Sequence, residues 1–383
     1  MIKNQRGIVL AGSLMILSAL AIAGVAARVM LQNDHRTSAN LRAGSQTFYL
    51  AASGIEWGKS EMLASPGLTP APADRSVDFT NGRFSVSFGS ALSIGPLSAQ
   101  FVVRSLGILG RDSHMLQARL SKIYDLADGA LGLRGNIQAV HFAGAGIAIS
   151  GLDHDPATGQ PDGAATGHLA VSTDSQSLSD LVGAQAASLP AGSWQSAAGG
   201  PAVAPSSHLT SAALSQLANT LCTAPGAVTL SIPITGALTL ANQIWGTPTT
   251  PQLSCIEGVS GAGDAVTLAG ESAGAGILVV RNADLILSGA MRWEGLILVT
   301  GSEVSLKAGV SSTTNIFGSV MINETATPGF GALALDIQGS FRVSYSRLAQ
   351  SRVAGLIPSS EFAALHASLP ASIKQDYWRS ESP

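Results

Sequence analysis

The stretch Met1–Met30, MIKNQRGIVLAGSLMILSALAIAGVAARVM, decides the fold class of this chain. A short leader carries Lys3 and Arg6 and ends at Gly7. The segment Ile8–Ala27 that follows contains no charged residue. A helix of roughly 20 apolar residues is long enough to cross the hydrocarbon core of a bilayer. We therefore expect Ile8–Ala27 to be a transmembrane helix.

The leader differs from that of an ordinary secreted protein. A secretory signal peptide is cut after its apolar core, which is then lost. Here the small residue Gly7 lies before the core, so we expect cleavage between Gly7 and Ile8 and an apolar helix that stays in the mature chain. The alternative is a signal anchor that keeps its leader. The positive charges before the span place the leader in the cytoplasm and the C-terminal bulk outside it.

The composition of the 383 residues indicates a β-rich protein. Charged residues make up 12% and aromatic residues 5%, whereas there are 43 glycines. Glycine suits tight turns, and the abundant β-branched residues suit pleated strands. A formal net charge of −3 lacks the basic footprint of nucleic-acid-binding proteins, so we expect no nucleic-acid partner.

The helical pattern continues beyond the apolar run. Large apolar residues recur every seven positions and form a predicted packing seam: Leu41, Phe48, Ile55 and Met62. Small residues between them would allow a sheet or another helix to approach closely. We expect one long helix that ends at Pro66–Gly67 and bends or breaks at its interior glycines.

The sequence divides into five predicted segments. Strand-like stretches follow the helix, and a turn in GILGRDS separates two of them. The last segment, AALHASLPASIKQDYWRSESP, reads as a helix and tail. We expect a leader (1–7), a transmembrane and amphipathic helix (8–66), a small antiparallel sheet (67–130), a large β-rich domain (131–362), and a C-terminal helix or tail (363–383).

The large domain contains short apolar runs separated by glycine. Gly276 and Gly295 each begin such a run, and a polar break and a second strand-like stretch follow each run. This offset of roughly twenty residues is similar to the coil length of a β-solenoid. The fold class we expect is α+β and then mostly β, with a solenoid-like domain. An ordinary β-sandwich is the alternative.

Three segments resemble PilX-type minor pilins of the type IV pilus assembly family. They are QRGIVLAGSLMILSALAIAGVAARVM, QTFYLAASGIEWGKSEM and VVRSLGILGRDSHMLQARL, which together cover roughly the first 120 residues. The resemblance implies storage in the bacterial inner membrane with the bulk in the periplasm, cutting at Gly7 by a prepilin peptidase, and N-methylation of Ile8. It also implies assembly with other pilins into a pilus or related filament outside the cell.

Two positions depart from the family pattern. Gly12 and Ala52 stand where the family usually has glutamate. The carboxylate at the first position would neutralise the N-terminus of an adjacent subunit. A subunit at the filament tip has no earlier neighbour to pair with. We therefore predict a tip position, where the large domain would engage a surface or an adhesin.

Two further groups of residues are candidate sites. Cys222 and Cys255 are the only cysteines, and an oxidising periplasm would favour a disulfide between them over two buried free thiols. Three carboxylates in GLDHDPATGQPDG have a spacing that could hold Ca²⁺, although a solvated turn explains them as well. They are Asp153, Asp155 and Asp162. We expect no other cofactor.

One motif raises the question of catalysis. Gly270–Gly274 reads GESAG, which matches the GxSxG signature of esterases and makes Ser272 a candidate nucleophile. Asp336 and His366 follow in the right chain order. The segment after the motif is strand-like, whereas a nucleophile elbow needs a helix there. We therefore expect no enzyme. A membrane-anchored hydrolase and a membrane-anchored binding protein outside any filament are the alternatives.

Overall fold

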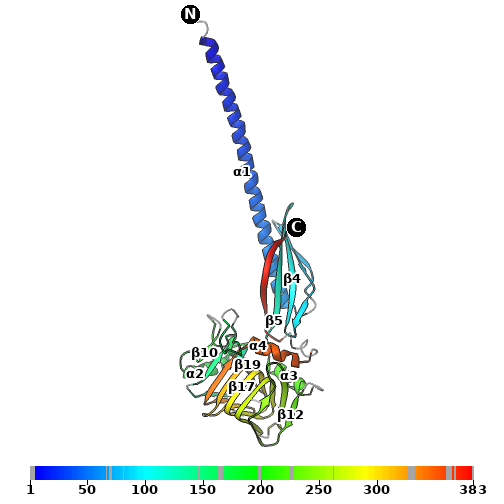
Figure 1. Cartoon of the computed structure of the whole chain (residues 1–383), viewed down its shortest axis with the longest axis vertical. Coiled ribbons are helices and arrows are strands. Elements are labelled where there is room, and N and C mark those ends of the chain that lie inside the picture. Colours follow the sequence, from blue (N-terminus) through cyan, green and yellow to red (C-terminus); the bar gives the residue numbers. More distant parts are fainter. Residues whose placement is uncertain are drawn as a thin grey trace.

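The molecule consists of a long helix, a small sheet around its C-terminal part, and a larger β domain at the far end (Figure 1). The computed structural model describes residues 5–65, 67–68, 71–80, 82–144, 146–162, 167–196, 200–223, 228–261, 263–326, 333–358, 365 and 368–381. Helix α1 spans Gln5–Ala64 without interruption, so the predicted break at its glycines is wrong. Packing of the C-terminal part on the sheet stabilises a helix that glycine alone would weaken.

The small sheet has six antiparallel strands in the order β1-β2-β4-β5-β22, with β3 paired to β4. The turn predicted in GILGRDS separates β4 from β5, which pair with each other. The bounds of the six strands are β1 Arg75–Phe79, β2 Gly82–Phe88, β3 Leu92–Gly95, β4 Ser98–Leu109, β5 Asp112–Tyr124 and β22 Ala371–Glu381.

Alternation along the strands decides which face α1 covers. Phe101 and Val103 on β4 are buried together with Leu120 on β5, because side chains two positions apart point to the same face. Helix and sheet come close at Gly107, where an added Cβ would lie 2.1 Å from the carbonyl oxygen of Thr47. Glycine at this position allows the helix backbone to lie directly on the sheet.

Strand β22 is the main departure from the predicted architecture. The C-terminal helix or tail expected over 363–383 is wrong from residue 371 onward, because Ala371–Glu381 pairs antiparallel with β5 along its whole length. Residues 363–364, 366–367 and 382–383 of that prediction lie outside the described residues. Pairing with β5 overrides a locally ambiguous sequence. The small sheet is therefore discontinuous in sequence, and the segment predicted as 67–130 omits its last strand.

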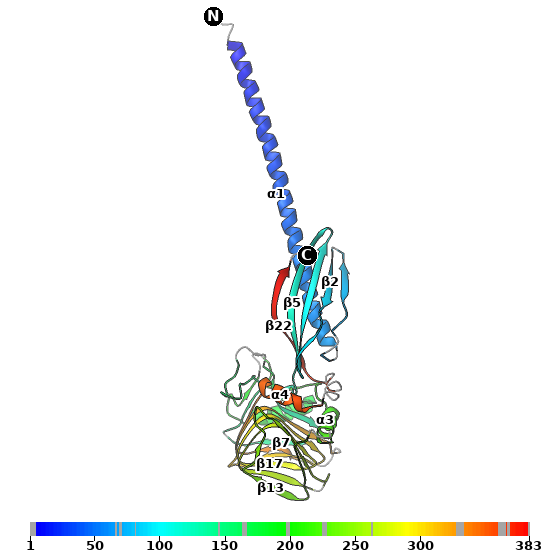
Figure 2. The ribbon, with the colours of Figure 1, turned by 45° about the vertical axis from the view of Figure 1, so that its right-hand side comes forward.

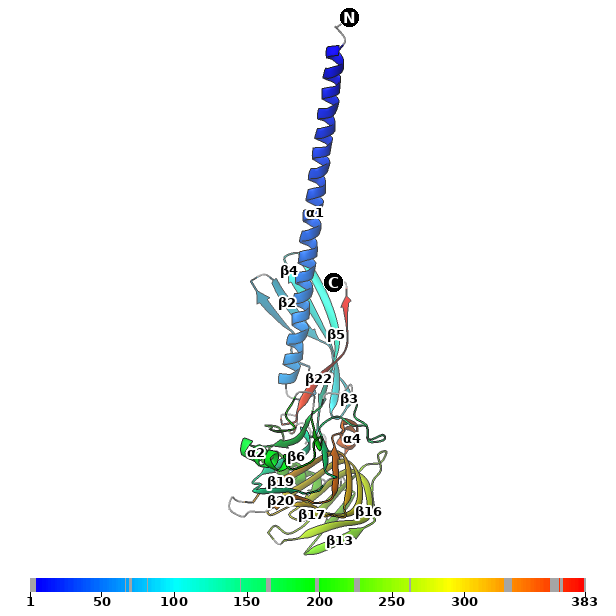
Figure 3. The same cartoon turned by 90° about the vertical axis from the view of Figure 1, so that its left-hand side faces the viewer.

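The larger domain contains a 16-stranded sheet whose strand pairs are all parallel. It curves into a half-barrel (Figures 2 and 3). Its strands are β6 Gly129–Gly135, β7 Ala139–Phe142, β8 Ala148–Ser150, β9 Leu169–Thr173, β10 Trp194–Gln195, β11 Val203–Pro205, β12 Leu230–Pro233, β13 Ala237–Ala241, β14 Ile244–Trp245, β15 Gln252–Glu257, β16 Ala265–Arg281, β17 Asp284–Gly301, β18 Leu306–Ala308, β19 Thr313–Glu324, β20 Leu333–Ile337 and β21 Ser340–Ser344. Its helices are α2 Gln176–Ala186, α3 Ser211–Thr223, α4 Arg347–Val353 and the 3-10 helix η1 Ala354–Leu356.

Glycines mark the places where the long strands bend. Gly276, Gly295 and Gly318 are direct partners on β16, β17 and β19, and their φ angles are +147°, +134° and +134°. Their alignment forms what we call the glycine row. The offset of roughly twenty residues predicted from Gly276 and Gly295 corresponds to this register. Only glycine adopts such a backbone without strain.

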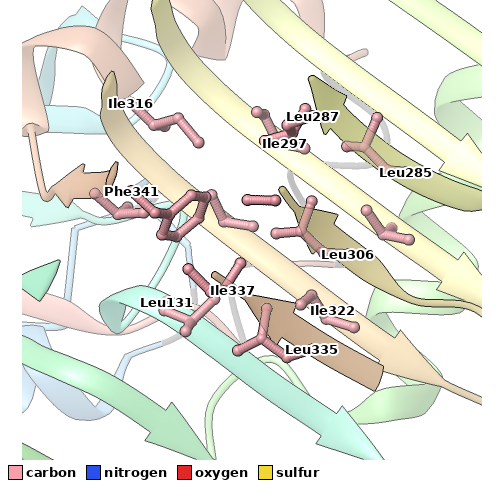
Figure 4. Packing of buried hydrophobic residues seen from close by; sticks show 14 of the residues in the cluster. Leu131, Leu285, Leu287, Ile297, Leu306, Ile316, Ile322, Leu335, Ile337 and Phe341 are labelled. Atoms are coloured by element: carbon pink, nitrogen blue, oxygen red, sulfur yellow. The ribbon is translucent and has the colours of Figure 1, made fainter. Parts of the chain in front are cut away.

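Both faces of the parallel sheet are buried along the C-terminal halves of β16 and β17 and along β19. Leu285, Leu306 and Ile337 come from different strands and point toward one another inside the half-barrel (Figure 4). On the other face, Ile277 packs in a second cluster with residues of α3 and α4. Burial on both faces explains why the strands read as continuous apolar runs rather than as alternating ones.

Candidate functional site

The N-terminal part of α1 carries an exposed apolar surface, here called the apolar arm (residues 12–31). An 18-residue window of α1 has a mean hydropathy of 2.2, and none of it is buried. By length and composition, α1 is able to cross a membrane. The large exposed side chains of the arm are Leu14, Met15, Ile16, Leu17, Leu20, Ile22, Val25, Val29, Met30 and Leu31.

The predicted processing positions lie at the start of this helix. Gly7 and Ile8 belong to α1, whereas residues 1–4 of the predicted leader lie outside the described residues. Gly12 lies in the first part of the arm, and no other atom would come within 4 Å of an added Cβ. Packing within the subunit therefore does not require glycine at position 12. The glycine at this position can therefore depend on contacts with other molecules rather than on packing within this chain.

The predicted packing seam is buried only in its C-terminal part. Ile55 and Met62 are 5% and 1% exposed, and Phe48 packs partly buried against the same cluster. Leu41 is 68% exposed, so the part of the predicted seam around it has no partner within the described residues, and its packing against another helix stays a prediction. The sheet covers α1 only from about Thr47 onward, so Leu41 extends the exposed surface of the helix.

An apolar hollow lies where α1 meets the last strand. Phe48 and Trp378 contact each other edge to face, with ring centroids 6.0 Å apart, at the side of a cavity of about 140 Å³. Trp378 remains 53% exposed. The lining residues are Phe48, Ala52, Ile55, Glu56, Leu116, Gln375 and Trp378. Ala52, which replaces the usual glutamate of the resembled family, lies in this hollow and keeps it apolar.

Lys122 on β5 anchors the C-terminal end of α1. Its Nζ donates hydrogen bonds to the carbonyl oxygens of Ser65 and Gly67, at 2.5 and 3.0 Å. The hydroxyl of Tyr124 also donates to Gly67, at 3.1 Å. A cation next to the last carbonyls of a helix complements the negative end of the helix dipole. Burial nevertheless lowers the pKa of Lys122 to about 8.

This depressed pKa predicts a pH dependence of stability. Between about pH 8 and the unfolded value of 10.5, the unfolded chain binds the Lys122 proton and the folded chain does not. The free energy of unfolding should therefore rise with pH across this window. We expect the rise to be smaller in Lys122→Met, measured by urea unfolding of the full chain in detergent. If the free energy of unfolding rose equally with pH in both proteins, the pH dependence would not come from Lys122.

A polar cluster joins the two sheets where the chain passes between them, a region here called the neck. Arg347 donates from Nε to Oδ1 of Asp125 at 2.8 Å, and Asp125 is only 1% exposed. The backbone N–H of Asp125 donates to the carbonyl oxygen of Pro370, which ties the outgoing chain to the returning one. The ring of His168 lies over that of Tyr345, with centroids 4.1 Å apart. Burial lowers the pKa of His168.

The three carboxylates predicted to bind Ca²⁺ have other roles. Asp153 accepts from the backbone N–H of Arg347 at 2.8 Å and so belongs to the neck. Asp155 accepts from the backbone N–H of Ala157 in its own turn. The described residues contain no group of three His, Cys, Asp or Glu side chains placed to hold a metal ion. The predicted site at Asp153, Asp155 and Asp162 is therefore not assembled as a metal site among the described residues.

Ser272 lies in the interior of β16, which continues to Arg281 with no helix after the motif. Its hydroxyl donates to the carbonyl oxygen of Ala269 at 3.1 Å and accepts from the backbone N–H of Gln243. Asp336 contacts His141 at 2.8 Å, and His366 lies outside the described residues. The GxSxG match thus forms part of a bent strand rather than a strand–turn–helix elbow.

Cys222 on α3 and Cys255 on β15 form a disulfide, with Cα atoms 5.7 Å apart. The bond fixes α3 to the sheet face that it covers. Sequence reasoning missed two features of the site, the anchoring role of Lys122 and the neck. A lysine within the apolar alternation of β5 was the available signal for the first. The neck joins residues more than 200 positions apart, such as Asp125 and Arg347, and had no local signal.

Comparisons with known proteins give few matches. No protein-family model matches the chain, and no curated protein matches it. Among solved structures, it is similar to the competence-associated pilin ComZ from Thermus thermophilus, at 13% sequence identity. The match covers 88% of this chain and 97% of ComZ, with a TM-score of 0.27. A similarity at this score carries no argument about function, so the proposal below depends on the chain's own residues.

Proposed function

We propose that this chain is a structural subunit, a minor pilin or pilin-like protein of a type IV pilus or related filament. The observation that carries the proposal is the apolar arm, which continues without a break into the packed part of α1. Full burial of a large apolar side chain contributes about 1.5–3 kcal/mol. Ten such side chains on the arm make its exposure to water very unfavourable, so the arm requires lipid or other apolar helices around it.

The same surface suits both environments of a filament subunit. In the inner membrane, acyl chains would surround the arm and hold the bulk of the protein in the periplasm. On assembly, helices of other pilins would replace the acyl chains, so the arm exchanges one apolar environment for another. Leu41 and the hollow at Trp378 extend this apolar surface toward the sheet.

The finer proposals concern processing and position. The PilX-type resemblance implies a prepilin peptidase that cuts before Ile8 and N-methylation of the new N-terminus. Gly12 has open surroundings, so a glutamate would fit there within the subunit. The absence of that glutamate supports a tip position, where no earlier neighbour would pair with it. The bulky parallel domain, which we propose to be solenoid-like, is difficult to repeat along a narrow shaft. At the tip it would be free to contact a surface or an adhesin.

The mature N-terminus tests the proposal most directly. We expect mass spectrometry of the native protein to show loss of Met1–Gly7 and one added methyl group on Ile8. Gly7→Val should keep the leader, because a branched side chain blocks the cutting position. Gly12→Ala is the matched control within the same helix and should be processed normally.

Purified filaments provide the second measurement. We expect the chain in sheared and washed filaments at low abundance relative to the major subunit. An intact leader together with absence from filaments would contradict the proposal and favour a membrane-anchored binding protein. Ester hydrolysis that disappears in Ser272→Ala would instead favour the hydrolase alternative.

A further inference from the structure

The parallel sheet ends in an uncovered edge at the side farthest from α1 (Figures 1 and 3). Three strands form this edge: β12 pairs with β15, and both β13 and β14 pair with β16. None of the three has a second strand partner among the described residues. We call these three strands the open edge.

The hydrogen-bond pattern of β13 shows which of its groups lack a strand partner. Ala265 donates its N–H to the carbonyl oxygen of Gly236, and Asn242 donates its N–H to that of Ala269. In a parallel ladder, alternate residues bond to the same neighbour, so the even positions of β13 face β16. The N–H and C=O groups of Ala237, Thr239 and Ala241 therefore point away from the sheet. Their spacing matches that of an added strand.

The side chains of the open edge give a second, independent indication. Leu230, Ile232, Leu238 and Leu240 pack against the core of the half-barrel but remain only partly buried. The corresponding residues of the next strand, Val266 and Leu268, are 0% and 3% exposed. One further strand against β13 would complete the burial of its leucines. The domain core is thus left open at this end.

The opposite end of the sheet is covered. Helix α2 contacts β7, β9 and β11, and it buries Leu178 and Val182 there. The edge strand β22 of the small sheet is protected differently, by Lys374 and by a bulge between Gln375 and Tyr377. Such helices, charges and bulges prevent unwanted strand pairing. Among the residues that the structure describes, the open edge has no comparable protection apart from Pro233 on β12.

Charge indicates the kind of partner. The segment from Leu209 to Ile256, which contains all three strands of the open edge, has no Asp, Glu, Lys, Arg or His. The exposed side chains of β13, on Ala237, Thr239 and Ala241, are small and uncharged. Charged side chains of a partner would find no opposite charge here. The partner would instead contact backbone groups and small side chains.

We propose that the open edge binds an extended, uncharged segment of another polypeptide as an additional parallel strand along β13. Main-chain hydrogen bonds to Ala237, Thr239 and Ala241 would provide the affinity, and the half-buried Leu238 and Leu240 would be covered by alternate side chains of the partner. This site does not depend on the proposed filament role and would function on any membrane-anchored form of the chain.

The test uses the full chain in detergent and an uncharged fluorescein-labelled peptide with the sequence of Ala265–Ala269, the segment that already pairs with β13 in parallel. We expect binding by fluorescence anisotropy. Thr239→Pro should weaken it about tenfold or more, because proline removes the central outward N–H. Thr239→Val keeps that N–H and is the matched control. Circular dichroism and thermal unfolding establish that both variants fold.

A second probe leaves the protein unchanged. The same peptide, N-methylated at alternate residues, cannot donate to β13 and should not bind. Binding of the methylated peptide, or equal binding to Thr239→Pro and wild type, would overturn the proposal. Absence of binding by the unmodified peptide would also overturn it. A concentration-dependent dimer that Thr239→Pro abolishes would make a second copy of this chain the occupant and equally contradict the proposal.

Discussion

Gly295→Ala should destabilise the parallel domain by about 2–6 kcal/mol, since backbone strain and overpacking each cost about 1–3 kcal/mol. Gly295 has a φ of +134°. An added Cβ would lie 2.1 Å from the carbonyl oxygen of Gly276 and 2.8 Å from Cγ1 of Val353. One contact is with rigid backbone and the other with helix α4, so relief would require both to move.

Tryptophan fluorescence during urea unfolding would measure this effect, because Trp293 is buried two residues away on the same strand. Gly309→Ala in the same domain is the matched control. An added Cβ there has nothing within 4 Å, and the variant should unfold close to wild type. If both variants unfolded at the same urea concentration, the glycine row would not be the constraint inferred from the structure.

Arg134→Met should have a comparable effect, of about 3–5 kcal/mol, because removing one partner of a buried ion pair leaves the other charge uncompensated. The Arg134 side chain is 0% exposed and donates two hydrogen bonds to the carboxylate of Asp128, at 2.8 and 3.0 Å. It also donates to the carbonyl oxygens of Ser172 and Leu209. Methionine is shorter, keeps only an apolar stem, and satisfies none of these acceptors.

Lys307→Met is the matched control for this prediction. Lys307 pairs with Asp284 at 2.6 Å, but its side chain is 40% exposed. Exposed pairs contribute about 0–1 kcal/mol, so the control should unfold nearly as wild type does. If both variants lost a similar amount of the free energy of unfolding, burial would not determine how much Arg134 contributes to stability.

Much of the fold could be predicted from local patterns. The uncharged run from Ile8 predicted a helix, and the alternation in β4 and β5 predicted paired strands close to their observed bounds. The spacing of Gly276 and Gly295 predicted stacked runs because each glycine marks the same bend in successive strands. These features are local, or they repeat at a fixed interval, so one sequence is sufficient to reveal them.

The errors concern contacts between distant parts of the chain. Nothing near residue 371 indicates that β5 is available as a partner, so the last strand read as a helix or tail. The packing seam was predicted without its partner, because the seven-residue pattern shared by Leu41 and Ile55 does not say where the sheet ends. Asp153 has the spacing of a metal ligand, yet its oxygen accepts from Arg347, which is 194 positions away.

The position of β22 has a consequence for the order of synthesis. Because β22 comes after the whole parallel domain, the strand that completes the first sheet is translated later than that domain. Until then, the edge of β5 and the Phe48 side of α1 lack their cover. The small sheet can therefore be completed only after the ribosome has translated the parallel domain. A chain that lacked β22 would leave the edge of β5 unpaired over Met115–Tyr124.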